Sequence, residues 1–194
     1  AIKVKDAMGV KNIEARENEL TQYVMGELSK NNRVMMLEPM ITKRLSIISF
    51  YIPGVHYNLV VRLLNDKFGI QTRGGCSCAG TYGHLLLGVD HDTSREITMK
   101  IDSGDYAEKP GWVRASFHPT TSDKEAQAVV SAINAITQNI ELWSKEYRFN
   151  PATGDFEHLQ MAVEYPGIEH FMPLPEVGSD EQEVSKSILR KIFG

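Results

Sequence analysis

Cysteine and long apolar runs are scarce in this chain of 194 residues, and each scarcity excludes a class of protein. Only two cysteines occur, Cys76 and Cys78, and a disulfide across the single residue between them would be strained. Two lone thiols suit a reducing compartment, so we expect a cytoplasmic protein rather than a secreted disulfide scaffold. No apolar stretch approaches the roughly 18 residues of a membrane helix, so no membrane partner is expected.

Excess positive charge is also missing. The formal net charge is −4, and no run of five or more lysines and arginines occurs. The chain therefore lacks the basic footprint that binds nucleic acid, and no nucleic-acid partner is expected. It begins at Ala1 with neither an initiator methionine nor a signal-peptide core, and it reads as a segment cut from a longer protein.

The remaining composition is that of an ordinary globular domain, with 42% hydrophobic and 24% charged residues. Apolar periodicity predicts the order helix, strand, strand, helix, strand, strand, helix. The expected helices cover residues 13–30, 56–68, 79–87 and a segment from Ser122 to about Trp143; the expected strands cover 34–37, 45–52, 69–73 and 112–117. Residues 90–111 are expected to be mostly surface loop around a short segment at 97–101.

The order of helices and strands predicts the fold class, and the change in composition after residue 144 predicts the domain division. Short strands with helices on one face predict an α/β sandwich of two layers, with a small mixed or antiparallel sheet. The predicted domain covers residues 1–144. Residues 145–194 are expected to form a C-terminal extension of a hairpin around 150–155, a linker rich in proline, glycine and acids, and a short helix over 183–193.

The most unusual stretch runs from Arg73 through Gly74, Gly75 and Cys76 to Cys78. Glycines let a loop approach a ligand closely, and an arginine beside a thiol favours the nucleophilic thiolate. These residues alone also fit a tight turn with two small buried cysteines, since free cysteine is among the most buried residue types.

A second candidate is Arg114, which lies inside the apolar, alternating segment 112–117. Its planar guanidinium suits a carboxylate, so one interpretation is a clamp for a substrate carboxylate. The alternative is an arginine at a strand edge that pairs with a local Asp or Glu. Spacing alone does not decide between the two.

The histidines do not lie at metal-ligand spacing. A zinc site of Cys76, Cys78 and His84 would have the right donor atoms, but Cys-x-Cys is a weak zinc signal and no second pair completes it. We therefore expect no metal site. Asp90, His91 and Asp92 are interpreted as a solvated loop.

Taken together, these segments resemble the C-terminal small domain of class V, fold-type I pyridoxal-phosphate (PLP) enzymes, over residues 2–143. The resemblance rests on Arg73, Gly75 and Cys78 in the pattern Arg-x-Gly-x-x-Cys of cysteine desulfurases and selenocysteine lyases. Arg114-Ala115-Ser116 and the helix that begins at a capping box of Ser122 and Glu125 follow it in the same order as in the family. It implies a parent enzyme whose large domain, upstream of Ala1, carries the PLP-binding lysine. It also implies that the parent is a homodimer.

The resemblance implies roles for these side chains in a parent that acts on an amino acid. Arg114 and Arg73 would bind the substrate, with Arg114 on its α-carboxylate. Cys78, activated partly by Arg73, would take up sulfur or selenium or protonate the departing atom. The chain by itself is expected to bind no PLP and to be inactive, because its partner, the large domain, is missing.

The chain departs from the family at Cys76-Ser77, where related desulfurases usually carry histidines. Which thiol reacts therefore stays open, and three functions remain. They are a carbon–sulfur or carbon–selenium lyase, a class V aminotransferase or related amino-acid enzyme whose cysteines are only loop residues, and an α/β binding module without enzymatic activity.

Overall fold

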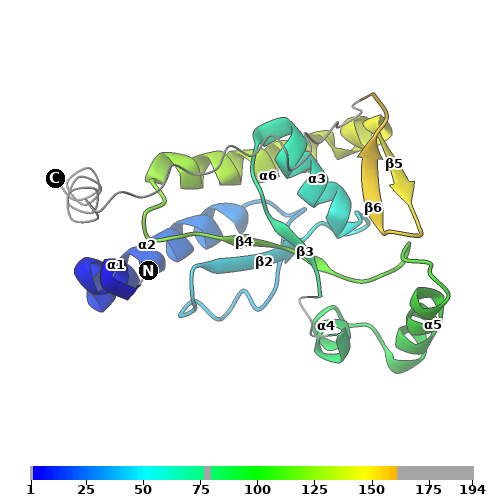
Figure 1. Ribbon diagram of the computed structural model, residues 1–194, viewed down its shortest axis with the longest axis horizontal. Helices are drawn as coiled ribbons and strands as arrows, with labels where there is room; N and C mark the ends of the chain where they lie inside the picture. Colours follow the sequence, from blue (N-terminus) through cyan, green and yellow to red (C-terminus); the bar gives the residue numbers. More distant parts are fainter. Residues whose placement is uncertain (1, 77–79, 161–194) are drawn as a thin grey trace, which may run out of the picture. The chain divides into compact units, whose positions relative to one another are not determined.

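The computed structural model describes residues 2–76 and 80–160 (Figure 1). Residues 15–161 form one compact unit, and helix α1 (Ile2–Met8) belongs to a second unit that includes residues 1–14. Helix α2 (Val10–Leu28) begins three residues earlier than expected and ends two residues earlier. In the described part of the chain, no helix has the length and apolar character needed to span a bilayer.

Four short antiparallel strands form the main sheet, in the order β1-β2-β4-β3. The strands are β1 (Met35–Met36), β2 (Ile47–Tyr51), β3 (Arg73–Gly75) and β4 (Trp112–Ser116). The strand predicted over 69–73 was wrong in position, because it shares only Arg73 with the observed β3. Gly69 instead ends the preceding helix with a positive φ of 67°, and pairing starts only at Arg73.

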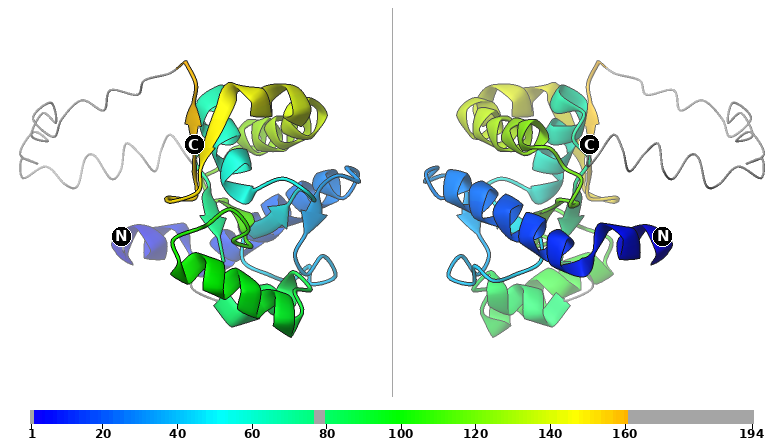
Figure 2. Two further views of the ribbon diagram at one scale, coloured as in Figure 1. Left: turned by 90° about the vertical axis from the view of Figure 1, so that its right-hand side faces the viewer. Right: turned by 90° about the vertical axis from the view of Figure 1, so that its left-hand side faces the viewer.

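The two inner strands bury one face of this sheet. The alternating residues Ile48 and Phe50 of β2 and Val113 and Ala115 of β4 pair with each other and are at most 5% exposed. They pack against apolar residues of α2, of α3 (Tyr57–Phe68) and of α6 (Asp123–Trp143). Figures 1 and 2 show α3 and α6 together on this side of the sheet. The α/β class with a small antiparallel sheet, expected from the sequence, is therefore confirmed, and α2, α3 and α6 form the helical layer that covers this face.

Two further helices, α4 (Gly80–Leu86) and α5 (His91–Asp102), lie on the other side of the sheet (Figures 1 and 2). The interpretation of residues 90–111 as mostly loop was therefore wrong. The side chain of Asp90 caps α5 by accepting hydrogen bonds from the backbone N–H groups of Asp92 and Thr93. Only Ile97 of this helix is buried, so the apolar periodicity of the segment is too weak to predict a helix.

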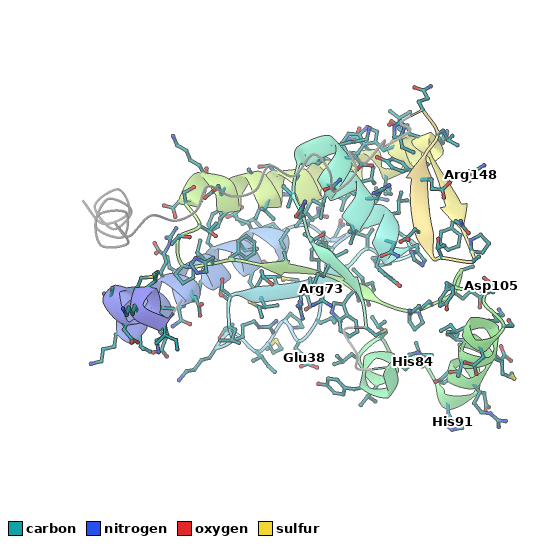
Figure 3. The ribbon with its side chains drawn as sticks, viewed as in Figure 1. Glu38, Arg73, His84, His91, Asp105 and Arg148 are labelled. Atoms are coloured by element: carbon teal, nitrogen blue, oxygen red, sulfur yellow. The ribbon has the colours of Figure 1, made fainter. Side chains whose placement is uncertain are left out.

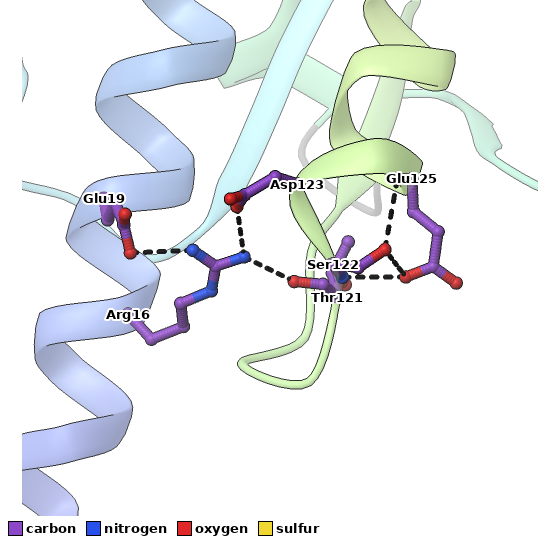
Figure 4. A network of polar contacts seen from close by, with 6 residues as sticks. All are labelled: Arg16, Glu19, Thr121, Ser122, Asp123 and Glu125. Carbon is purple, nitrogen blue, oxygen red and sulfur yellow. Dashed lines mark hydrogen bonds and ion pairs between the residues drawn. The ribbon is translucent and has the colours of Figure 1, made fainter. Parts of the chain in front are cut away.

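Helix α6 begins as the sequence predicts, with a capping box of Ser122 and Glu125. A neighbouring contact ties this helix start to α2 (Figure 4). The Arg16 guanidinium donates hydrogen bonds of 2.7 Å to the Thr121 carbonyl, to Asp123 and to Glu19. The side chain thereby joins the two long core helices through a planar, multiply bonded group.

A two-stranded hairpin, β5 (Tyr147–Asn150) and β6 (Asp155–His158), follows α6 after a short 3₁₀ turn over Ser144–Glu146. The hairpin was expected from the sequence. The linker predicted over 166–180 and the helix predicted over 183–193 lie outside the described residues. The division of the chain at residue 144 stays a prediction.

The ring of Tyr57, at the start of α3, lies close to the backbone of β3 and of the segment entering β4. A Cβ atom built at Gly111 would be 2.5 Å from the Tyr57 ring and 2.8 Å from the Cα atom of Gly75. A Cβ atom at Gly74 would be 2.7 Å from the same ring. Real side chains do not approach so closely, so glycine at both positions permits this packing.

We therefore expect Gly111→Ala to destabilise the chain by about 1–3 kcal/mol, because both a ring and a backbone strand must move. Gly26→Ala is the matched control: Gly26 lies inside α2, where an added Cβ meets nothing within 4 Å. That substitution should stabilise the chain by about 1 kcal/mol through helix propensity. Urea unfolding of the three proteins measures both effects, and a Gly111→Ala protein as stable as wild type would contradict the packing argument.

His56 caps α3 from inside an aromatic cluster. Its Nδ1 atom accepts a hydrogen bond of 3.2 Å from the Asn58 N–H, so this nitrogen is unprotonated. Its ring stacks on Tyr57 at 4.5 Å between centroids and contacts Phe149 and Phe156 of the hairpin. Burial lowers the pKa of His56, with Lys109 acting in the same direction, while the Tyr106 backbone and Asp155 oppose the shift.

Because the folded-state pKa lies below the unfolded value, the folded chain binds fewer protons than the unfolded chain near that pH. The contribution of His56 to stability is therefore complete above about pH 6.5 and is lost as the pH falls through the folded-state pKa. His56→Asn keeps a capping side chain but cannot titrate, so its free energy of unfolding should fall less than that of wild type between pH 7.5 and 5. The exposed His118→Asn is the control and should follow wild type; identical pH profiles for all three would refute the assignment.

Candidate functional site

The second face of the sheet brings the two predicted arginines together. In the strand register, Arg73 of β3 pairs with Arg114 of β4, and Arg114 pairs with Ser49 of β2. Strand partners point to the same face of a sheet, and the neighbouring residues Phe50 and Val113 point to the buried face. Arg73 and Arg114, called the arginine row below, therefore face away from the helical core. Figure 3 shows Arg73 between the helical layer and α4, which carries His84.

The pairing is unusual because like charges directly opposite each other in a sheet are unfavourable. Within residues 2–76 and 80–160, neither guanidinium has an ion pair or a side-chain hydrogen bond, and the Nε atom of Arg114 is buried without a partner. β4 is an inner strand, so Arg114 does not lie at a sheet edge. Among the described residues, the alternative of a local Asp or Glu partner for Arg114 is therefore wrong, and the row is suited to an anion.

Cys76 lies directly after β3 and is fixed by its neighbours. Its thiol donates a hydrogen bond to the Pro110 carbonyl, with 2.8 Å between Sγ and oxygen. A Cβ atom built at Gly83 of α4 would be 3.2 Å from both the Cys76 Sγ atom and the Trp112 ring. Burial raises the pKa of Cys76, and Lys109 only partly opposes the shift. A thiol that donates to a carbonyl and ionises late is a poor nucleophile at neutral pH.

Cys78 and His84, the other residues considered as site candidates from the sequence, have different outcomes. Cys78 lies outside the described residues. The Nδ1 atom of His84 is 2.6 Å from the Ser94 hydroxyl, which ties α4 to α5. In the ranges 2–76 and 80–160, no group of three or more metal-ligating side chains is found, while the expected absence of a metal stays a prediction.

Exposed apolar side chains surround β1 and its connection to β2. Met40 is 90% exposed and Leu45 is 68% exposed. In the same region Met35 and Ile41 are about half exposed. Large apolar side chains gathered in this way are typical of a surface that another protein segment covers.

Several neighbours of the arginine row were not found from the sequence. Ser49 joins it only through the register of β2 and β4, which local patterns do not reveal. Trp112 is 5% exposed although it points to the open face, because α4 covers it. For Tyr57 a signal did exist: glycines at 74 and 111 in or beside short strands indicate close approach of another group.

Comparison with known proteins gives a consistent result. The family model "Aminotransferase class-V" matches residues 1–129. A probable cysteine desulfurase from Halobacterium salinarum is 28% identical over 131 residues, which cover 68% of this chain and 26% of that protein. The chain thus spans about a quarter of the length of this relative.

Two solved structures are also similar. The apo structure of a cysteine desulfurase from Thermococcus onnurineus NA1 has a TM-score of 0.49 at 23% identity, over 69% of this chain and 28% of that one. The S-sulfonic acid form of the cysteine desulfurase CsdA from Escherichia coli has a TM-score of 0.43 at 21% identity, over 65% and 25%. Since the family model covers well over half of the sequence, the chain belongs to the aminotransferase class-V family.

Proposed function

We propose that this chain is the C-terminal part of a PLP-dependent lyase that cleaves the carbon–sulfur or carbon–selenium bond of cysteine or selenocysteine. The observation that carries the proposal is the row of Arg73 and Arg114, two cations without an acidic partner in the described residues, beside the loop that leads to Cys78. The name of the relative from Halobacterium salinarum supports the sulfur chemistry.

In this proposal PLP is bound covalently by the rest of the parent, and this chain binds the substrate. None of the four strands of the main sheet carries a lysine, which agrees with a PLP-binding lysine in another part of the parent. The arginine row suits the carboxylate of an amino-acid substrate instead. When bound, PLP supplies an electron sink for bond cleavage at the amino acid. The exposed apolar side chains around β1 suit the missing large domain, which we propose as their cover.

The arginines would perform the first part of the work. Arg114, with its buried Nε atom unpartnered among the described residues, binds the α-carboxylate through two parallel N–H···O bonds. Arg73 lies opposite on the neighbouring strand and adds a second positive charge at the same face. The fixed carboxylate then holds the substrate side chain in one direction relative to the loop.

The thiol would perform the second part. Cys78 forms a sulfur–sulfur bond to the substrate sulfur while the substrate carbon–sulfur bond breaks. The electron pair of the broken bond and one proton end on the β-carbon, so cysteine becomes alanine and the thiol becomes a persulfide. We assign this role to Cys78 rather than Cys76, because the Cys76 thiol is bound to the Pro110 carbonyl and its pKa is raised by burial.

The two thiols can be separated by alkylation. In Cys78→Ser, Cys76 is the only thiol, and we expect iodoacetamide to modify it about tenfold more slowly at pH 7.5 in the folded chain than in urea, because burial raises its pKa. In Cys76→Ser, the remaining thiol should react faster than Cys76 does in the folded chain. If folded Cys76 is modified as fast as in urea, it is not protected and it returns as a candidate nucleophile.

The reaction itself is tested in the full-length parent by alanine release from cysteine and selenocysteine. Arg114→Lys keeps the positive charge but loses the two parallel N–H donors of the guanidinium, so KM for cysteine should rise about tenfold or more. Cys78→Ser should abolish release, whereas Cys76→Ser should retain it because serine also donates to the Pro110 carbonyl. Arg148→Lys, an exposed hairpin residue that pairs with Glu157, is the control and should leave KM unchanged.

Undiminished release by Cys78→Ser would remove this cysteine from the mechanism. Amino-group transfer to a 2-oxoacid, in place of alanine release, would identify the parent as an aminotransferase. In that case the arginine row keeps its role, because an aminotransferase substrate carries the same carboxylate.

A further inference from the structure

The hairpin of β5 and β6 lies beyond residues 1–129, the part that matches the family, and it contacts the segments that hold the arginine row. The Asn58 side chain of α3 donates a hydrogen bond of 2.6 Å to the hairpin carbonyl of Gly154. The backbone N–H of Tyr106 donates one of 2.9 Å to the Pro151 carbonyl. The hairpin is therefore bonded both to the start of α3 and to the segment that leads into β4.

Asn58 also contacts β3 with the other end of its amide. A Cβ atom built at Gly74 would be 2.8 Å from the Asn58 Oδ1 atom and 3.1 Å from Val61. Gly74 is the residue that follows Arg73. One amide side chain thus lies between the hairpin and the backbone adjacent to the exposed arginine.

An aromatic route leads in the same direction. Phe149 and Phe156 of the hairpin are 4.9 Å apart between ring centroids, and each contacts His56. His56 stacks on Tyr57, whose ring lies against the glycines of β3 and against Gly111. Packed rings of this kind transmit a displacement because the interior has little free space.

β3 needs such support. It has only three residues, lies at the edge of the sheet and is paired with β4 alone. Two of the three are glycines, which fix the backbone less than other residues do. Its pairing also places Arg73 opposite another positive charge, which is unfavourable. The ladder to β4 by itself is therefore a weak determinant of where Arg73 lies.

We propose that Asn58, together with the hairpin that it bonds, positions β3 so that Arg73 and Arg114 act on one carboxylate. Asn58 is a positioning residue, since it acts through Gly74 and touches no substrate in this arrangement. The proposal rests on the proposed function for its kinetic consequence. Its structural part, the support of β3 by the hairpin, holds for any reaction at this face.

Asn58→Ala in the full-length parent tests the kinetic consequence. We expect KM for cysteine to rise about five- to tenfold, while kcat stays within about twofold, because the carboxylate is bound less well and the reacting groups are unchanged. The matched control is Asn65→Ala on the same helix, where the exposed amide donates only to Asp66. It should leave both constants unchanged.

A merely structural role for Asn58 gives a different result. Partial unfolding lowers the amount of active enzyme, so kcat falls while KM stays the same. That pattern, or unchanged kinetics, overturns the proposal. Phe156→Leu provides a milder change from the hairpin side and should raise KM in the same direction by about two- to threefold; an unchanged KM there also counts against the hairpin.

Hydrogen exchange separates failure of this proposal from failure of the proposed function. If the wild-type parent releases no alanine, the lyase assignment is wrong, and the amides of residues 73–75 in the 194-residue chain decide the rest. If these amides exchange faster than in wild type in Asn58→Ala, but not in Asn65→Ala, the hairpin does hold β3 in place. Equal exchange in both variants overturns it.

Discussion

Arg73 and Arg114 face each other across two strands, and the described part of the chain offers neither of them a carboxylate. Like charges placed directly opposite each other in a sheet repel, and surrounding water weakens the repulsion. Arg73 is exposed, so water weakens the repulsion at this side chain. Such a pair lowers the stability of the chain alone, and a bound carboxylate relieves the repulsion in proportion to how closely both groups approach it.

The rest of the sheet accommodates this repulsion because its two faces do different work. Ile48, Phe50, Val113 and Ala115 bury one face against three helices, and this burial fixes β2 and β4 independently of the charges. β3 lacks a large side chain on either face apart from Arg73. It depends on the approach of Tyr57 and Asn58 to a glycine backbone, so support that would normally come from its own side chains comes from α3.

The parts of this arrangement that local chemistry determines were predictable. The capping box at Ser122, the termination of α3 at Gly69 and the alternation along β4 each depend on residues close in sequence. The shift of β3 was not predictable, because residues 69–72 have strand-like side chains but follow directly from a helix end. Helix α5 was missed for a different reason: it is held mainly by its Asp90 cap and buries one apolar residue.

The candidate site divides in the same way. Sequence patterns identified Arg73 and Arg114 as unusual, and the family resemblance suggested that they act together. Their opposition across β3 and β4, however, depends on strand register, and a slip of one residue would send Arg114 to the core face. The contribution of Asn58 could not be found in sequence at all, since it joins segments 96 residues apart through a backbone carbonyl.

In the proposed function the arginine row binds the substrate carboxylate, but it does not by itself determine the reaction. Every substrate of an amino-acid enzyme carries an α-carboxylate, so a carboxylate anchor suits a lyase and an aminotransferase equally well. The reactions differ in what happens to the substrate side chain, and a fixed carboxylate directs that side chain toward whatever group lies beside the row. Cys76 is restrained there by the Pro110 carbonyl and by Gly83. If the parent is the proposed lyase, Cys78 is the group that acts on the substrate side chain, while the sheet and its supports determine how well the substrate is held.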